Sequence, residues 1–477
     1  MRRRTKIICT VGPSSNNWET MQSMHEAGMD VVRINMSHST HDEAEQTVGW
    51  VHALNRKRHD EIPILVDTSG PEIRTGERVE PLNLVPGTKV ILSGNPRSDE
   101  SSELAHINIG YADFGKSVRV GDTIRLDNGL INLDVLERTG SGLVCRVADG
   151  GELGSKRHVN LPGVHVDLPS ISSKDRDDIA FAKEHDVSFI AQSFVRSADD
   201  VLAMREVLGN AHQWVKVIAK IENYEGVDQA ESIAKAAFGV MVARGDLGIE
   251  TDIAKLPSLQ RRLVDTTLRL GRRCILATHL LESMVENPIP TRAEAIDVAN
   301  AVYEGVDAVL LSSETSIGKR PTLAVEQLRQ IIEESERYPG LDFSQALVTD
   351  DIKQNLAKSA SELAEHSGAA GIVVITRSGL MADLVTNCAP SNVPIFAFSN
   401  LNHTLRRLML NRGVYPYRTS FNNNSEMTIQ SAFEVLRKRE NLPPDAILVV
   451  VSDVLSKGAV DSIQIRHADP SYGATML

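Results

Sequence analysis

Charged and hydroxyl side chains follow several short apolar runs of this chain, at positions that share one face. Arg33, Asn35 and Ser37 alternate along one such segment. Lys220 and Glu222 stand two residues apart at the end of another. Alternate residues of a β-strand point to the same side of it. Cations and carboxylates gathered in this way are the groups that bind and polarise phosphoryl groups.

The same pattern recurs at four more apolar runs. Each run is followed by polar residues: DTSGPEIR (67–74), ARGDLG (243–248), ATH (277–279) and SSET (312–315). Each has an ordinary explanation alone, because a lone Asp after a strand commonly caps a helix and a Lys beside a Glu is commonly a surface ion pair. Six strand ends that all carry such groups indicate one shared site.

The residue types favour metal-assisted phosphate chemistry. Glu222 and Asp246 are candidates to hold Mg²⁺, which prefers one or two carboxylates together with substrate phosphate and water. Arg33, Arg74 and Lys220 supply positive charge for a transferring phosphoryl group. A set of mostly neutral oxygens with one carboxylate suits a monovalent ion and consists of Asn35, Ser37, Asp67 and Thr68. The sequence has no glycine-rich phosphate loop of the Walker type, which argues against a P-loop kinase.

The elements that would position these residues form a parallel barrel. We predict eight strands: Lys6–Thr10, Asp30–Asn35, Pro63–Asp67, Val187–Gln192, Lys216–Ile221, Gly239–Ala243, Cys274–Ala277 and Ala308–Leu311. Amphipathic helices are predicted at Thr40–Arg58, Ser197–Leu208, Leu256–Leu270 and Thr291–Tyr303, and Thr40 and Glu43 have capping-box spacing. Eight strands alternating with helices predict a (β/α)8 TIM barrel, whose reactive face is the carboxyl end of its strands.

Two further units accompany the predicted barrel, which takes residues 1–71 and 167–340. Residues 72–166 read as an inserted β-barrel domain that covers the site as a lid, although a rigid decoration is an alternative. Its predicted strands are Thr88–Ser93, Val118–Val120, Thr123–Leu126, Ile131–Leu136 and Leu143–Val147. Residues 341–477 read as an α/β domain with strands at Gly371–Thr376, Pro394–Phe398, Val414–Tyr417, Ala446–Val451 and Ser462–His467.

Bulk composition narrows the class of protein. The chain has 477 residues and a formal net charge of -12, which argues against nucleic acid as a partner. No apolar stretch approaches the length of a membrane span, and we expect no membrane association. The four cysteines lie far apart without a CxxC pair, which favours reduced thiols and a cytoplasmic location.

Several motifs together make the sequence resemble the pyruvate kinase family along nearly its whole length. They occur in order as TKIICTVGPSS (5–15), RINMSH (33–38), DTSGPEIRTG (67–76), NLPGVHVDLP (160–169), IAKIEN (218–223), MVARGDLGIE (241–250), TRAEAIDVANAV (291–302) and LLSSETSIGKRP (310–321). The resemblance implies transfer of the phosphoryl group of phosphoenolpyruvate to ADP, giving pyruvate and ATP in the last step of glycolysis. It also implies a homotetramer with a regulatory C-terminal domain.

The resemblance also implies residue roles. Arg33 and Arg74 would bind the transferring phosphate, and Lys220 would stabilise the phosphoryl in flight and the enolate. Other implied contacts are K⁺ (Asn35, Ser37, Asp67, Thr68), Mg²⁺ or Mn²⁺ (Glu222, Asp246), the substrate carboxylate (Ala243, Arg244, Gly245), the carbon that is protonated (Thr278) and the nucleotide (Arg74, His38, Asn35). Because Glu72 accompanies potassium dependence in the family, we expect that dependence here.

Three positions depart from the family pattern. Ser69 replaces a usual Lys, His279 a usual Gln and Ser313 a usual Gly. The first predicts weaker nucleotide binding, and the second a shifted pH profile, because His titrates near neutrality. None removes a metal ligand or Lys220, so we expect activity.

An effector site in the C-terminal domain is a further hypothesis. Thr376, Arg377, Ser378 and Gly379 form a loop that could cradle a phosphate, with a plain strand-to-helix turn as the equal alternative. Leu380 stands where relatives carry Arg, and the Lys457-Gly458 loop lacks a glycine-rich run. We therefore expect a sugar monophosphate or a nucleotide as effector, in preference to fructose bisphosphate.

Two other functions fit part of the pattern. A barrel aldolase or lyase acting on pyruvate would share the fold and the carboxylate pair, but it would need neither the insert nor ADP. A catalytically silent sensor would bind phosphoenolpyruvate without turnover.

Overall fold

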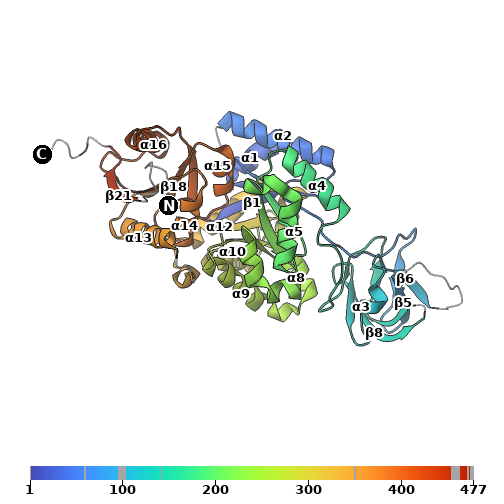
Figure 1. Cartoon of the computed structure of the whole chain (residues 1–477). Coiled ribbons are helices and arrows are strands. Elements are labelled where there is room, and N and C mark those ends of the chain that lie inside the picture. Colours follow the sequence, from blue (N-terminus) through green and yellow to red (C-terminus); the bar gives the residue numbers. More distant parts are fainter. Residues whose placement is uncertain are drawn as a thin grey trace.

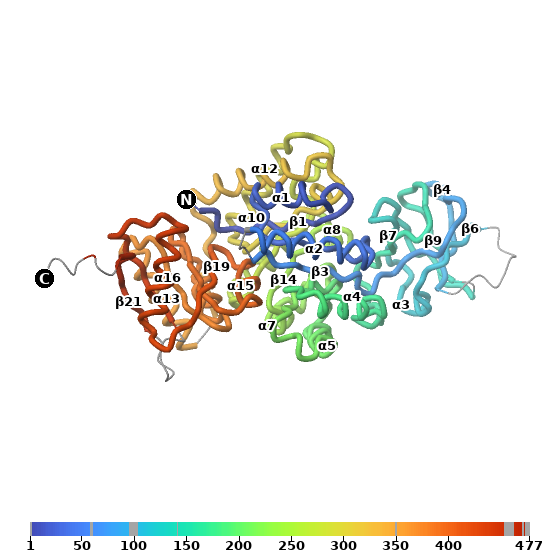
Figure 2. Tube along the Cα trace, turned by 90° about the horizontal axis from the view of Figure 1, so that it is seen from above, coloured from blue at the N-terminus to red at the C-terminus, as the bar shows by residue number. Residues whose placement is uncertain are grey.

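The computed structural model describes residues 2–58, 61–94, 104–140, 142–348, 351–452, 462–469 and 472. Three parts lie in a row (Figures 1 and 2). A central barrel separates the inserted residues at one end from the C-terminal domain at the other. Among the described helices, none is long and apolar enough to cross a membrane.

Eight parallel strands close the central barrel, as predicted. They are β1 (Lys6–Thr10), β2 (Val31–Asn35), β3 (Ile64–Asp67), β12 (Phe189–Gln192), β13 (Lys216–Ile221), β14 (Gly239–Ala243), β15 (Arg273–Ala277) and β16 (Ala308–Leu311). Their order around the barrel is β1-β16-β15-β14-β13-β12-β3-β2. All eight carboxyl ends therefore meet at one rim, where the polar residues follow them.

Helices surround these strands. They are α1 (Trp18–Ala27), α2 (His41–Arg58), α4 (Ser173–Glu184), α5 (Ala198–Leu208), α6 (Tyr224–Asp228), α7 (Ala230–Ala236), α8 (Arg244–Glu250), α9 (Leu256–Arg269), α10 (Arg292–Tyr303), α11 (Ser313–Ser316) and α12 (Pro321–Ser335), with short 3-10 turns at Gly209–Gln213, Ile253–Lys255 and Glu282–Val285. The predicted capping contact exists, because Thr40 N donates to the Glu43 carboxylate at 2.9 Å. Capping by Thr291 starts α10 in the same way, at the predicted position.

Alternation along the barrel strands divides their apolar residues between two cores. Ile7 and Cys9 of β1 pack outward against the helices, whereas Ile8 points into the barrel. Phe189 and Met241 fill the interior with Ile8. Because both faces of the sheet are buried, the strands read as continuous apolar runs in the sequence. The interior is packed, so chemistry is confined to the rim.

The inserted residues form β-structure between β3 and α4. One sheet holds β11 (Val159–Asn160), β7 (Thr123–Leu126), β8 (Ile131–Thr139), β9 (Gly142–Asp149), β5 (Lys89–Ser93) and β6 (Ala105–Asn108), and a pair holds β4 (Leu82–Leu84) and β10 (Gly151–Leu153). Where a β-barrel was predicted, the described residues form an open six-stranded sheet with β11 and β6 at its edges. Both sheets share one apolar core.

The predicted strand at Val118–Val120 is wrong. Val118 ends the short helix α3 (Phe114–Ser117), and the chain then turns, with Arg119 N donating to the Asp122 carboxylate at 2.7 Å. Val118 is fully buried, but Val120 is exposed. The alternation of Val118 and Val120 therefore does not mark a strand. The two valines belong to a turn, in which one side chain is buried in the core and the other faces solvent.

The C-terminal domain is an α/β sheet in the order β19-β18-β17-β20-β21. Its strands are β17 (Gly371–Ile375), β18 (Ile395–Ser399), β19 (Val414–Arg418), β20 (Ile447–Ser452) and β21 (Ser462–His467), all near their predicted positions. Its helices are α13 (Ile352–His366), α14 (Leu380–Asn387), α15 (Asn402–Leu408) and α16 (Ser425–Glu440), after a 3-10 turn at Phe343–Ala346. Among the strands described in this domain, β21 alone pairs antiparallel, with β20.

The first strand ties the barrel to this domain. The Glu336 carboxylate accepts hydrogen bonds from Thr5 N at 2.7 Å and Arg4 N at 2.8 Å. Lys6 Nζ donates to Val414 O at 2.6 Å and lies 4.8 Å from the centroid of the Tyr415 ring. The amino end of β1 is therefore buried against the C-terminal sheet.

Candidate active site

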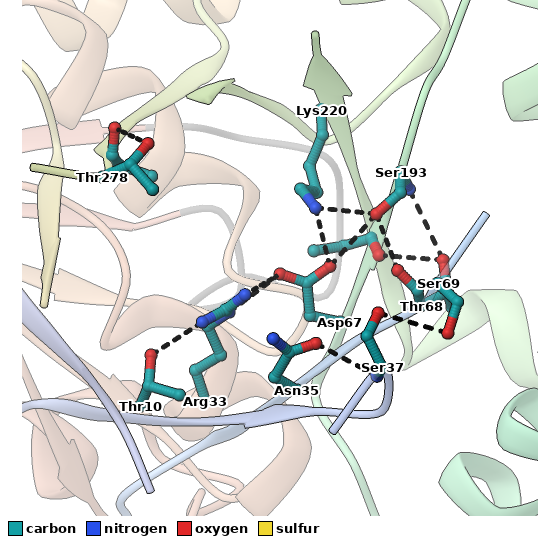
Figure 3. A network of polar contacts seen from close by, with 12 residues as sticks. Thr10, Arg33, Asn35, Ser37, Asp67, Thr68, Ser69, Ser193, Lys220 and Thr278 are labelled. Atoms are coloured by element: carbon teal, nitrogen blue, oxygen red, sulfur yellow. Dashed lines mark hydrogen bonds and ion pairs between the residues drawn. The ribbon is translucent and has the colours of Figure 1, made fainter. Parts of the chain in front are cut away.

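Asp67, at the end of β3, joins two cations at the barrel rim (Figure 3). Its Oδ1 accepts a hydrogen bond from Lys220 Nζ at 3.1 Å, and its Oδ2 accepts one from Arg33 Nε at 2.8 Å. Burial would raise the pKa of Asp67, but Lys220 and Arg33 outweigh it and the pKa is lowered. Asp67 therefore stays a carboxylate and holds both cations in place.

Ser193 belongs to this network, and sequence reasoning missed it. Its Oγ accepts from Lys220 Nζ at 2.7 Å and donates to Thr68 O at 2.6 Å (Figure 3). Ser193 directly follows β12, so it stands at a strand end like the residues that were predicted. Its position after a predicted strand could have pointed to Ser193, but a single serine at a strand end is too common to indicate a functional role.

Two carboxylates come from neighbouring strands. Glu222 follows β13, and its Oε1 lies 3.1 Å from Lys220 Nζ while its Oε2 accepts from Phe194 N at 2.7 Å. Asp246 lies in the first turn of α8, which follows the adjacent strand β14. Burial raises the pKa of Glu222 and the charge of Asp246 adds to the effect.

This donor set fits a divalent cation. Glu222 is buried and Asp246 is half-buried. A shared positive ion would relieve the repulsion between them, and Mg²⁺ commonly uses one or two carboxylates with substrate and water oxygens. In the part of the chain that the structure describes, no cluster of three or more His, Cys, Asp or Glu residues forms a metal site. Such a cation would therefore depend on substrate or water for its other ligands.

Neutral oxygens gather beside Asp67. Asn35 Oδ1 accepts from Ser37 N at 3.1 Å, and Ser37 Oγ donates to Ser69 Oγ at 3.2 Å (Figure 3). Thr68 Oγ1 donates to Ala191 O at 3.3 Å. The four residues predicted to hold a monovalent ion are thus neighbours, and the departure at Ser69 adds a hydroxyl to this group.

A strained turn forms the opposite side of the rim. Thr278 and His279 have φ of 71° and 54°. A positive φ is unfavourable for the β-branched Thr278, and such strained residues cluster at functional sites. Arg244 holds the turn, because its Nη2 donates to Thr278 O at 2.6 Å and its Nη1 pairs with Asp297 at 2.7 Å. Gly245 N donates to Thr278 Oγ1 at 2.9 Å. The predicted residues after β14 and β15 are therefore in direct contact.

Comparison with known proteins agrees with this geometry. Residues 2–325 match the family described as "Pyruvate kinase, barrel domain", and residues 354–466 match "Pyruvate kinase, alpha/beta domain". The chain belongs to the pyruvate kinase family.

Individual relatives match over nearly all of the chain. It is 37% identical to the pyruvate kinase of Dictyostelium discoideum over 97% of this chain and 94% of that protein. It is 38% identical to the pyruvate kinase of Geobacillus stearothermophilus, over 98% of this chain and 80% of that protein. Plastidial pyruvate kinase 2 of Arabidopsis thaliana is also 38% identical, over 98% of this chain and 81% of that protein.

The remaining predicted residues of this pyruvate kinase family site lie where the insert begins. Arg74 forms an isolated β-bridge with His158, and its Nη2 pairs with the Glu72 carboxylate at 2.6 Å. Burial lowers the pKa of His38, and the charges of Arg33 and Arg74 lower it further. His38 therefore lies between the rim and the insert, and Arg74 pairs with Glu72 in place of joining the Asp67 network.

The eighth strand end has a structural role in this fold. Glu314 is fully buried, and its carboxylate accepts from Leu281 N at 3.0 Å and from Ser312 N at 2.7 Å. It thereby joins the loops after β15 and β16. Ser313, one of the three departures, begins α11 next to this contact.

The proposed effector loop is a tight turn between β17 and α14. Gly379 N donates to Thr376 Oγ1 at 3.0 Å, and Leu380 N donates to Ser378 Oγ at 3.3 Å. Arg377 O accepts from Thr404 Oγ1 at 2.7 Å. The hydroxyls of Thr376 and Ser378 are thus engaged within the turn, and the effector role stays a prediction. The Lys457-Gly458 loop lies outside the described residues.

Proposed function

We propose that this protein catalyses phosphoryl transfer from phosphoenolpyruvate to ADP, forming pyruvate and ATP. The network of Arg33, Asp67, Ser193 and Lys220 at the barrel rim carries this proposal, together with membership of the pyruvate kinase family. An oxygen of the ADP β-phosphate forms the new P–O bond while the bond from phosphorus to the enol oxygen breaks. The resulting enolate is then protonated at carbon.

Different residues of the rim would bind the phosphoryl group, orient the cations and organise protonation. Arg33 and Lys220 face the same region from β2 and β13, so they bind and neutralise the phosphoryl group from two sides. Asp67 cannot accept that role because it is anionic; it orients both cations instead. Thr278, held by Arg244, lies across the rim and is placed to organise protonation of the enolate. Because charge develops among fixed donors, little reorganisation is needed during transfer.

Two cations complete the proposal. Glu222 and Asp246 would hold Mg²⁺ or Mn²⁺, and Asn35, Ser37, Asp67 and Thr68 would hold K⁺. When bound, these ions supply positive charge that neutralises the substrate carboxylate and phosphates. The paired carboxylates and the cluster of neutral oxygens beside Asp67 support this assignment.

The insert would act as a lid over the nucleotide. Arg125 Nη1 donates to Thr251 O at 3.2 Å, and Asn160 Nδ2 donates to the Glu250 carboxylate at 2.8 Å. These contacts link the insert to the end of α8, the helix that carries Asp246. Movement of the insert would therefore shift α8 and with it Asp246, the carboxylate proposed to bind the metal ion. Arg74 and His38 would contact the nucleotide beneath the insert.

Assembly and location complete the proposal. We expect a homotetramer, which light scattering of the purified protein would test. All four cysteines are free thiols, and three are buried, which supports a reducing compartment such as the cytoplasm.

An omission assay tests the function directly. Purified protein is mixed with phosphoenolpyruvate, ADP, Mg²⁺ and K⁺, pyruvate is followed with coupled lactate dehydrogenase, and each component is left out in turn. Pyruvate formation that requires both ADP and Mg²⁺ supports the kinase. Pyruvate release without ADP would show hydrolysis of phosphoenolpyruvate and would contradict phosphoryl transfer to ADP; a lyase would form no pyruvate in this mixture. Phosphoenolpyruvate binding without turnover, with the effectors also supplied, would favour a sensor.

A further inference from the structure

A second cavity lies at the opposite end of the barrel from the candidate active site. We call it the basal cavity; its volume is about 510 Å³, within the range of small-molecule sites. Its barrel wall includes Lys216 and Arg273, which begin β13 and β15, and Phe238, which precedes β14. Leu380 of α14 and Arg407 of α15 form part of the facing wall. The basal cavity is thus shared by the barrel and the C-terminal domain.

The lining of the basal cavity is rich in cations. Five Lys and Arg residues line it, namely Arg205, Lys216, Arg272, Arg273 and Arg407, against two Asp residues, Asp351 and Asp383. Asp383 pairs with Arg407 at 2.6 Å, and Asp351 caps α13 by accepting from Lys353 N at 2.9 Å. Arg273 pairs with Asp307 at 2.9 Å.

Three of these cations have no carboxylate partner. Among the described residues, Arg205, Lys216 and Arg272 form no ion pair. Lys216 Nζ donates to Gln213 O at 2.6 Å, and Arg272 Nη2 donates to Lys235 O at 3.1 Å. The Nε of Arg272 is buried without a hydrogen-bond partner. An unpaired buried donor is unfavourable and normally has an acceptor that completes it.

The electrostatics of the basal cavity agree with an anionic ligand. Burial lowers the pKa of Lys216 to about 8; Arg407 and Arg205 add to that shift, and Asp383 opposes it. Burial also lowers the pKa of Arg272, with added effects of Arg273 and Arg205. Protonated side chains thus repel one another in this place, and an anion bound among them would relieve the repulsion.

Apolar side chains form the rest of the wall. Val217, Phe238, Leu270 and Leu384 line the basal cavity beside the cations. A bare inorganic ion would leave this surface unused. A ligand that carries both an anionic group and an organic body would contact both parts of the wall.

We propose that the basal cavity binds a small phosphate monoester. Arg205, Lys216 and Arg272 hold the phosphate, and the organic body packs against Phe238 and the neighbouring leucines. The basal cavity adjoins the 376–379 loop, because Arg407 Nη2 donates to Ser378 O at 2.8 Å, but its three unpaired cations come from the barrel. Strands β13, β14 and β15 run from this cavity to Lys220, Ala243 and Ala277, so occupancy would change the kinetics of the active site; that second part rests on the proposed function.

Calorimetric titration of the full-length protein tests binding without needing turnover. The probes are glucose 6-phosphate, AMP and inorganic phosphate. At least one ester should bind at one site per chain and more tightly than inorganic phosphate. Arg205→Ala and Arg272→Ala should each weaken that binding by roughly tenfold, since each removes a charge-assisted hydrogen bond. The matched control is Arg262→Ala, an exposed arginine of α9 outside the cavity.

A second variant separates the two candidate effector sites. Ser378→Ala removes a hydroxyl of the 376–379 loop without adding charge next to Arg407, and it should leave ester affinity unchanged. Circular dichroism and thermal unfolding confirm that each variant is folded. The proposal is overturned if no ester binds, if the Arg205 and Arg272 variants bind like the Arg262 variant, or if inorganic phosphate binds as tightly as the esters. Absence of kinase activity with binding intact would overturn the proposed function alone.

Discussion

Lys220 Nζ donates a hydrogen bond of 2.7 Å to Ser193 Oγ, and that hydroxyl donates in turn to Thr68 O at 2.6 Å. A hydroxyl has one proton, and the backbone oxygen can only accept, so the direction of both bonds is settled. Ser193 thereby fixes the Lys220 ammonium between the ends of β3 and β13. We infer that Ser193 positions Lys220 for the reaction.

Replacement of Ser193 by alanine should lower kcat by roughly tenfold with little change in KM for phosphoenolpyruvate, because hydrogen bonds to charged groups contribute about 1.5–3 kcal/mol. Steady-state kinetics measures the split. Ser188→Ala is the control, since Ser188 is also buried but lies at the other end of the same strand. Equal effects of the two variants would show that Ser193 has only a structural role.

Lys220→Met should abolish turnover while phosphoenolpyruvate still binds. Burial would lower the pKa of Lys220, but Asp67 and Glu222 outweigh it and raise the pKa, so Lys220 acts as a fixed cation and not as a base. Loss of that cation should reduce kcat by about a thousandfold or more. The coupled assay measures turnover and calorimetry measures binding. Retained turnover would contradict the assigned role.

Potassium should be required for full activity. Glu72 pairs with Arg74, and the oxygens of Asn35, Ser37 and Thr68 lie together beside Asp67. Exchange of KCl for tetramethylammonium chloride at constant ionic strength should lower kcat about tenfold or more, because a fixed positive charge near the phosphoryl group is lost. Equal rates in the two salts would refute a potassium site.

The ion pair between Arg244 and Asp297 should be needed to hold the turn at Thr278 in place. Asp297→Asn weakens the pair that orients Arg244, so the strained backbone of Thr278 and His279 loses its support. We expect kcat/KM to fall by roughly tenfold, since the buried cation Arg244 loses its anionic partner. Asp265→Asn is a matched control, because Asp265 is equally exposed and pairs with Arg269 on a surface helix. An unchanged rate for Asp297→Asn would show that Arg244 supports the turn without its pair with Asp297.

Alkaline pH should stabilise the junction between the barrel and the C-terminal domain. Burial lowers the pKa of Lys6 to about 8 in the folded protein, from 10.5 when unfolded. Between these values the unfolded chain binds more protons, so stability rises with pH. From pH 7 to pH 9.5 the gain is about 2 kcal/mol.

Comparison with Lys6→Met isolates this contribution. The free energy of unfolding of the wild type should rise relative to that of the variant over the same pH interval, as measured by denaturant titration. A difference that does not change with pH would show that Lys6 titrates normally.

Local pattern was enough to predict the barrel and most of its rim. Arg33, Asn35 and Ser37 share a face because side chains alternate along a strand, and the eight apolar runs read as strands because both faces of the sheet are buried. The roles of Glu222 and Asp246 remain predictions, but their origin on neighbouring strands is confirmed.

Contacts between distant segments were decided only by the tertiary structure. The bond between Ser193 and Lys220 depends on the order of strands around the barrel, and no local pattern encodes that order. The turn at Val118–Val120 depends on which valine the core of the insert buries. Arg205, Lys216 and Arg272 are unremarkable cations in the sequence, and they form one cavity because β13 and β15 begin at the same end of a closed barrel, against a domain that follows it in the chain.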